Sequence, residues 1–121
     1  MAIVGIGVDI EEIARFDRVE PDRLLTRVFT ECERSYCFSK RQPGRHFAAR
    51  FAAKEATVTA VSRTLPGLRI TQVELYKEPG SSAPLVRLIN GATLPEHLIL
   101  HVSVSHAKEY ATAFVVAEIV G

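Results

Sequence analysis

The sequence lacks the features of several common protein classes. Its two cysteines, Cys32 and Cys37, fit neither a disulfide framework nor the CxxC spacing of a zinc site. No apolar run approaches the roughly 18 residues of a membrane span, and the segment Met1 to Val8 has no basic part of a secretory signal. Fifteen basic and fourteen acidic side chains give a net charge of +1, which selects no nucleic-acid partner. We therefore expect a soluble cytoplasmic protein that binds neither membranes nor nucleic acid.

What the sequence does contain is sufficient for one folded domain, residues 1–121. Apolar residues make up 47% of the chain and charged residues 24%, and neither a repeat nor a linker divides it. The charge is unevenly distributed. Residues 13–50 carry nine basic and five acidic side chains, whereas residues 64–121 carry one more acidic than basic side chain. This asymmetry indicates either an acidic or phosphate-bearing partner, or an arginine-rich face that only contacts solvent.

Periodicity predicts helices early in the chain and antiparallel strands late, which is an α+β fold. Residues 3–10 form a continuous apolar run, which predicts a strand buried on both faces. Thr30 and Glu33 form a capping box that starts a helix. The helices expected are 11–19, 21–28, 30–38, 46–62 and a short polar one ending at 96; the strands are 3–10, 70–77, 85–89, 98–105 and 110–120.

Two acidic positions interrupt otherwise apolar segments. Asp9 ends the first strand, and Glu55 follows Lys54 inside a helix rich in alanine and phenylalanine. A charge in a buried helix is costly unless it is paired or binds a metal. Lys54 lies four residues after Arg50, so these cations share a helix face and repel each other without an anion nearby. Two carboxylates with cations beside them suit Mg²⁺ together with a phosphate group.

Each of these residues also has a structural interpretation that the spacing leaves open. Asp is a favoured N-cap, so Asp9 is also compatible with capping a helix that starts at Glu11. Lys54 and Glu55 are equally compatible with an internal ion pair, or Glu55 with a pair to an arginine.

The four histidines do not indicate a zinc site. His101 and His106 have opposite parity and point to opposite faces of the strand expected there. Neither HExxH nor a paired CxxC occurs. His106 lies at the expected hairpin turn and is the most site-like histidine, the alternative being an exposed turn residue.

Four segments carry a family pattern. They are GVDI at residues 7–10, FTECE at 29–33, RFAAKEA at 50–56 and HVSVSHAKEYATAFVV at 101–116. In this order, over the whole chain, they resemble the holo-acyl-carrier-protein synthases, the small bacterial 4′-phosphopantetheinyl transferases. The combination of RFAAKEA, the GVDI strand and the VSxSH turn is highly specific.

The resemblance implies an enzyme that moves the phosphopantetheine arm of coenzyme A to a serine of an apo acyl carrier protein and releases 3′,5′-ADP. This reaction belongs to fatty acid biosynthesis and lipid metabolism. The resemblance further implies a homotrimer with active sites at the subunit interfaces. Asp9 and Glu55 match the positions that hold Mg²⁺ and carry out catalysis, and Glu55, directly or through a metal-bound water, would accept the serine proton.

The resemblance also assigns the basic residues. Lys54, Arg50 and His106 match positions that contact the phosphates of coenzyme A or assist the proton transfers, and Lys54 would stabilise or protonate the leaving 3′,5′-ADP. Arg15 and Arg27 match the early helical region that docks the carrier protein. Their alternative role is to contact solvent or pair with nearby acidic residues.

The chain departs from the family pattern at two places. Many members have a lysine near the phosphates four residues after the motif glutamate, where this chain has Thr59. The turn GSSAP at residues 80–84 is longer than the usual Gly-x-Pro. Two other functions stay open: a small hot-dog thioesterase, which needs no Mg²⁺, and a non-catalytic carrier-binding module.

Overall fold

The computed structural model describes residues 1–17 and 23–121. Helices dominate the first half of the chain and antiparallel strands the second, which confirms the α+β class. The elements in chain order are β1 (Ala2–Glu12), α1 (Ile13–Asp17), α2 (Leu24–Val28), α3 (Glu31–Phe38), α4 (Pro43–Ala60), the 3₁₀ turn η1 (Ile70–Gln72), β2 (Val73–Tyr76), β3 (Leu85–Leu88), β4 (Leu98–His106) and β5 (Tyr110–Ile119).

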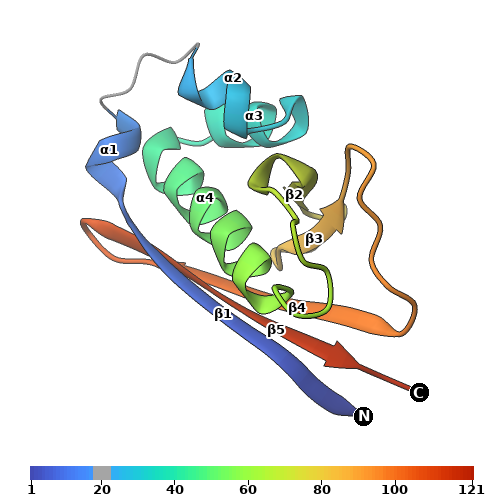
Figure 1. Ribbon diagram of the computed structural model, residues 1–121. Coiled ribbons are helices and arrows are strands. Elements are labelled where there is room, and N and C mark those ends of the chain that lie inside the picture. Colours follow the sequence, from blue (N-terminus) through green and yellow to red (C-terminus); the bar gives the residue numbers. More distant parts are fainter. Residues whose placement is uncertain (18–22) are drawn as a thin grey trace.

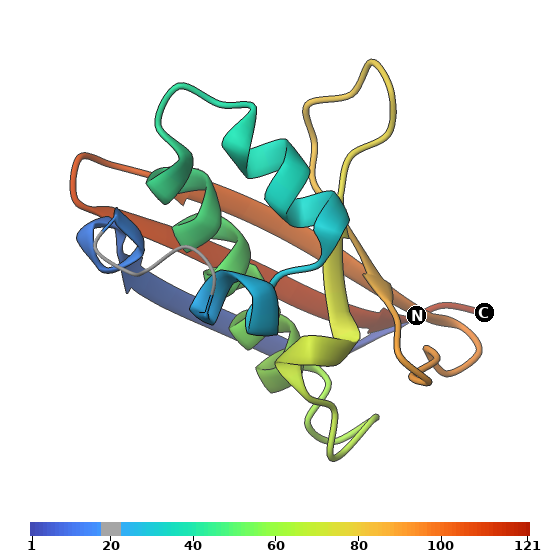
Figure 2. The same cartoon turned by 90° about the horizontal axis from the view of Figure 1, so that it is seen from above.

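A three-stranded antiparallel sheet forms the base of the fold. Its strand order is β1-β5-β4, so the first strand lies at one edge and pairs with the last. The long helix α4 lies along one face of this sheet (Figure 1). Strands β2 and β3 form a separate two-stranded sheet beside α4, and α3 lies on the same side of the molecule (Figure 2).

Helix α4 approaches β1 unusually closely because two residues of the strand have no side chain. A Cβ atom at Gly5 would overlap the carbonyl oxygen of Ala60, and one at Gly7 would overlap that of Ala56. The alanines of α4 facing the sheet are fully buried, together with Val115 of β5. Small residues on both surfaces therefore bring the helix axis near the edge strand.

A second core is built from phenylalanine rings. Phe16 of α1 and Phe29, which follows α2, pack against Phe47 and Phe51 of α4, with ring centroids 4.9 to 6.5 Å apart. Edge-on and tilted ring pairs of this kind add to the stabilisation that burial itself provides. The early helices are thus fixed over the first half of α4.

The outer face of the sheet is apolar and exposed in this chain. Ile6, Val8 and Ile10 of β1 retain more than half of their accessible surface, and Tyr110 and Phe114 of β5 nearly half. The prediction that the first strand is buried on both faces is therefore wrong for the single chain. Its second apolar face has no covering element among the described residues.

Three further predictions are corrected. Strand β1 continues to Glu12, so Asp9 lies inside a strand and caps no helix. Helix α4 begins at Pro43, because proline fits the first helical turn, where its missing N–H has no partner to lose. The short helix expected before Glu96 is not formed, and residues 92–95 have no regular structure. No helix in the described part of the chain is both long and apolar enough to cross a membrane.

Candidate active site

Asp9 and Glu55 are brought together where β1 passes α4. Asp9 pairs with Ala113 in the sheet, and one of its carboxylate oxygens is buried without a hydrogen-bond partner. Glu55 is half-buried on the helix. Burial and the negative charge of Asp9 raise the pKa of the Glu55 carboxyl, partly offset by Arg15. The two predicted metal ligands therefore share one site, and their charges are not balanced.

A third carboxylate, Glu11, lies beside this pair. Burial, a hydrogen bond with Asp9 and the charge of Asp9 raise the pKa of Glu11 to about 7, against the opposing charge of Arg15. Glu11 is not among the residues predicted from the sequence, because a helix was expected to start there. Residues two apart in a strand point the same way, so a strand extended to Glu12 would have identified it.

The carboxylate site fits Mg²⁺ in its chemistry. Mg²⁺ needs only one or two carboxylates, with waters and substrate phosphates as its other ligands. An unpartnered, buried oxygen of Asp9 next to a carboxyl with a raised pKa is the environment that a divalent cation would stabilise. Among the described residues, no group of three or more His, Cys, Asp or Glu forms a complete metal cage. The donor set therefore suits a metal that keeps open positions.

Lys54 does not reach this site. Its side chain is fully buried and its Nζ lies 2.9 Å from Oε1 of Glu33, which is equally buried. Lys54 also donates to the backbone carbonyl of Val73 in β2. Burial lowers the pKa of Lys54, while Glu33 opposes that shift. The sequence-based contact of Lys54 with coenzyme A phosphates stays a prediction, and this structure gives the side chain no exposed surface with which to make it.

Arg50 and His106 belong to a second group of side chains, away from the carboxylate pair on α4. The Arg50 guanidinium stacks on the ring of Tyr36 in α3, with Cζ 3.9 Å from the ring centroid. The His46 ring lies between the rings of Tyr36 and His106, at centroid distances of 5.9 and 6.3 Å. Arg50 is 5% exposed and its Nε has no hydrogen-bond partner. The structure thus groups two of the three predicted phosphate-binding residues, Arg50 and His106, around His46 and Tyr36.

The two predicted docking arginines are exposed. Arg15 donates to Glu11 at 3.1 Å, an exposed i,i+4 ion pair of small energetic value. Arg27 lies on α2 and forms no ion pair with a described residue. Arg18 of the same basic stretch lies outside the described residues.

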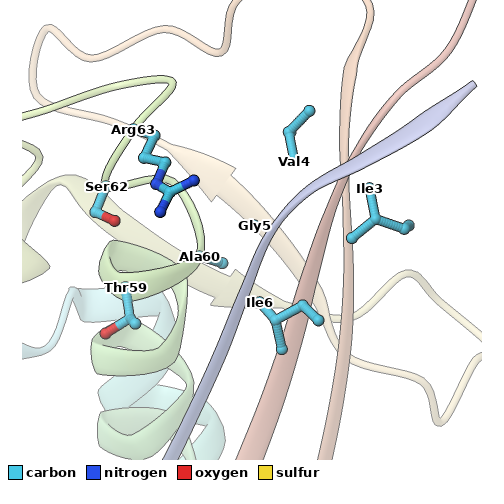
Figure 3. Close-up of a pocket in the computed structure, with 8 residues that line it drawn as sticks. All are labelled: Ile3, Val4, Gly5, Ile6, Thr59, Ala60, Ser62 and Arg63. Atoms are coloured by element: carbon cyan, nitrogen blue, oxygen red, sulfur yellow. The ribbon is translucent and has the colours of Figure 1, made fainter.

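A cavity opens one helical turn beyond Glu55. It has a volume of about 460 Å³ and lies between the end of α4 and the start of β1. Figure 3 shows Thr59, Ser62 and Arg63 on the helix side, with the Arg63 guanidinium extending towards the strand, and the Ile3 and Ile6 side chains beyond the strand. Thr59, the residue that departs from the family pattern, is therefore a polar lining residue here.

Comparison with known proteins finds a matching family. A model of the 4′-phosphopantetheinyl transferase superfamily matches residues 5–115. Holo-[acyl-carrier-protein] synthase of Chlamydia trachomatis serovar L2 is 40% identical, with 94% of this chain and 98% of the relative covered. The Syntrophotalea carbinolica enzyme of the same name is 41% identical, with 94% of each chain covered.

Solved structures agree with the sequence comparison. The holo-(acyl-carrier-protein) synthase of Bacillus anthracis in complex with CoA (3′,5′-ADP) superposes with a TM-score of 0.76 at 31% identity, covering 98% of both chains. The Helicobacter pylori enzyme in complex with coenzyme A has a TM-score of 0.72 at 27% identity, covering 93% of this chain and 99% of that one.

Proposed function

Since the chain belongs to the 4′-phosphopantetheinyl transferase superfamily, we propose that Asp9 and Glu55 form the catalytic metal site of its transfer reaction. The chain is a holo-acyl-carrier-protein synthase, which transfers the 4′-phosphopantetheine arm of coenzyme A to an apo acyl carrier protein. The thioesterase and the non-catalytic module are accordingly set aside. The observation that carries the site assignment is the buried, unpartnered Asp9 oxygen beside Glu55.

Asp9 and Glu55 hold one Mg²⁺ ion. When bound, the ion would neutralise the coenzyme's pyrophosphate and the negative charge that develops on the leaving group as the phosphoanhydride P–O bond of the pyrophosphate breaks. Glu55 lies within the electrostatic field of Asp9 and is partly accessible. It accepts the proton of the carrier serine, whose oxygen attacks the phosphorus, and 3′,5′-ADP is the leaving group.

Arg50 and His106 bind phosphate groups of the coenzyme. Arg50 presents a planar guanidinium with an unsatisfied Nε, a geometry that matches phosphate oxygens. Lys54 has no exposed surface, so the neutralisation of the leaving group falls to Arg50. Lys54, the residue before Glu55 in α4, instead holds α4 against α3 through its ion pair with Glu33.

Carrier docking uses Arg15 and Arg27. Both are exposed on the early helices, within the stretch that carries the surplus of basic residues. Carrier proteins of this kind are acidic, so exposed arginines accelerate encounter more than they tighten the complex. The ion pair of Arg15 with Glu11, beside the carboxylate pair, supports a docking surface adjacent to the site of transfer.

The chain assembles as a homotrimer in the cytoplasm. An apolar face of the sheet is exposed in the single chain, formed by Ile6, Val8, Ile10, Tyr110 and Phe114. Exposed apolar patches of this kind mark protein–protein contact surfaces. The carboxylate pair and Arg50 lie on different sides of α4, which supports active sites that are shared between subunits. The two free cysteines, Cys32 and Cys37, suit a reducing compartment.

Mass spectrometry of an apo carrier incubated with the protein, coenzyme A and Mg²⁺ tests this assignment. A mass gain of one phosphopantetheine arm, absent with EDTA, is expected. D9A and E55A should both abolish the gain while the fold is kept, whereas E78A, which removes an exposed carboxylate in a loop, should not. Transfer at the wild-type rate by D9A or E55A would refute the metal site. Carriers from fatty-acid, polyketide and peptide synthases, compared in the same assay, identify the preferred substrate.

A further inference from the structure

Arg15 lies between the carboxylate site and the surface proposed for carrier docking. Its Nη1 donates to Oε1 of Glu11 at 3.1 Å, and the Glu11 side chain is 13% exposed whereas that of Arg15 is 49% exposed. The Arg15 Cζ also lies 5.1 Å from the ring centroid of Phe51 and 5.5 Å from that of Phe16. One part of the arginine side chain is therefore held by the protein, while the rest faces solvent and can receive a partner.

Glu11 links this arginine to the two proposed metal ligands. Residues two apart in a strand point the same way, so Glu11 lies beside Asp9, with which it forms a hydrogen bond. Burial raises the pKa of Glu11 and that of Glu55, and the charge of Arg15 opposes both shifts. The electrostatic field of Arg15 thus reaches the carboxylates that are proposed to bind the cation.

The charge of Arg15 is consequently shared by two binding events. Mg²⁺ held by Asp9 and Glu55 would offset their negative charge and weaken their attraction for Arg15, which leaves the arginine freer to attract an acidic partner. An acidic group bound to Arg15 would in turn offset the positive charge that repels a cation from the carboxylates. Each event therefore favours the other.

We propose that Glu11 is a positioning residue that couples these events, so that the bound metal strengthens binding of the acidic carrier and the bound carrier strengthens binding of the metal. This inference rests on the proposed function. Glu11 belongs to none of the four segments that carry the family pattern, so the coupling is a property of this chain. The link is a partly exposed ion pair, which limits the coupling to about a fivefold change in either dissociation constant.

Equilibrium binding in the absence of coenzyme A tests the proposal, because no transfer then takes place. The probe is a fluorescently labelled apo carrier, chosen as the one that accepts the arm in the mass-spectrometric assay. Its dissociation constant is measured by anisotropy with saturating Mg²⁺ and with EDTA at equal ionic strength. For the wild type we expect a constant about fivefold lower with Mg²⁺. E11Q keeps the size of the side chain and removes its charge, so it should reduce this ratio to less than about twofold.

Calorimetric titration with Mg²⁺ provides a second readout. By linkage, the wild type should bind Mg²⁺ more tightly with the carrier present, by the same factor that the anisotropy gives. R15M should remove the coupling as E11Q does, and it replaces E11Q if that variant does not fold. R27M is the matched control, because Arg27 is exposed on the same docking surface and forms no ion pair with a described residue. It should weaken carrier binding equally with and without Mg²⁺, which leaves the ratio at the wild-type value.

Each other outcome counts against the proposal. A wild-type ratio near one, or a ratio that E11Q and R15M leave unchanged, would refute coupling through Glu11. A ratio that falls as far in R27M would assign the effect to the overall positive charge of the surface. A carrier that binds the wild type neither with nor without Mg²⁺ would instead refute the docking role within the proposed function.

Discussion

The buried pair of Lys54 and Glu33 decides whether Lys54 is structural or catalytic. Replacing Lys54 by methionine keeps the aliphatic volume and removes the ammonium group. The Glu33 carboxylate would then stay at zero exposure without its cation. We expect K54M to lower the stability strongly and to leave the reaction largely intact in the molecules that remain folded.

The magnitude follows from the contacts of Glu33. Breaking a buried pair by removing one partner costs about 3–5 kcal/mol. Glu33 keeps two backbone donors, the N–H of Leu75 at 2.7 Å and of Thr30 at 2.9 Å, so we expect the lower end, about 3 kcal/mol. For a chain of 121 residues this corresponds to a Tm decrease of roughly 12 °C.

Urea unfolding and transfer kinetics, measured well below the Tm of the variant, separate the two roles. The double variant K54M/E33Q should recover part of the lost stability, because no buried charge remains. R87M is the matched control. It also removes a cation from a glutamate pair, but the Arg87 side chain is half exposed, so about 1 kcal/mol or less should be lost.

Two results would overturn this reasoning. K54M with wild-type stability would mean that the pair contributes nothing. K54M that is folded but has a KM for coenzyme A raised a hundredfold, unrelieved by E33Q, would return Lys54 to the phosphate site.

Three further predictions concern subunits, docking and pH. If active sites are shared between subunits, E55Q and R50M chains that are inactive alone should regain about a quarter of the wild-type activity when they are co-assembled in equal amounts. The reason is that one site in four then has both residues intact. No recovery of activity would mean that both residues belong to the site of one subunit. R27E should raise the KM for the carrier several-fold and flatten its salt dependence without changing the KM for coenzyme A; parallel salt curves would remove Arg27 from docking. Burial, Arg50, His106, Lys40 and Arg45 lower the pKa of His46 to about 4, so the unfolded chain binds the extra proton between pH 4 and 6.5 and stability should rise with pH in that window. H46Q should reduce this slope in urea titrations at pH 4.5 and 7, and an unchanged slope would contradict the shift.

Local patterns predicted the elements well where the signal is contained in a few neighbouring residues. The capping box of Thr30 and Glu33 is formed as expected, with both reciprocal hydrogen bonds present. The hairpin of β4 and β5 and the long alanine-rich helix also follow from periodicity alone. Asp9 and Glu55 were singled out because each interrupts an apolar segment; the structure brings them together, and their role as metal ligands stays a prediction.

The partners of charged residues were not predictable in the same way. The sequence analysis considered Glu55 as the partner of Lys54, since it is adjacent in the chain. The structure instead pairs Lys54 with Glu33 of α3, and only the packing of α3 on α4 brings them together. Arg50 and Lys77 likewise reach the ring of Tyr36 from separate segments, and Glu11 was missed through an error of two residues in the end of a strand.

The absence of side chains at Gly5 and Gly7 affects the candidate active site, although neither residue is part of it. They let β1 lie against the backbone of α4, and the same strand and helix carry Asp9 and Glu55. The spacing of the two carboxylates is therefore set during folding, by contact between main chains, before any coenzyme arrives. The free energy needed to bring two like charges together is met by packing elsewhere in the domain, so the proposed Mg²⁺ ion would find its ligands preorganised. A single methyl group at Gly7 would widen this gap and reduce turnover without touching a reacting atom.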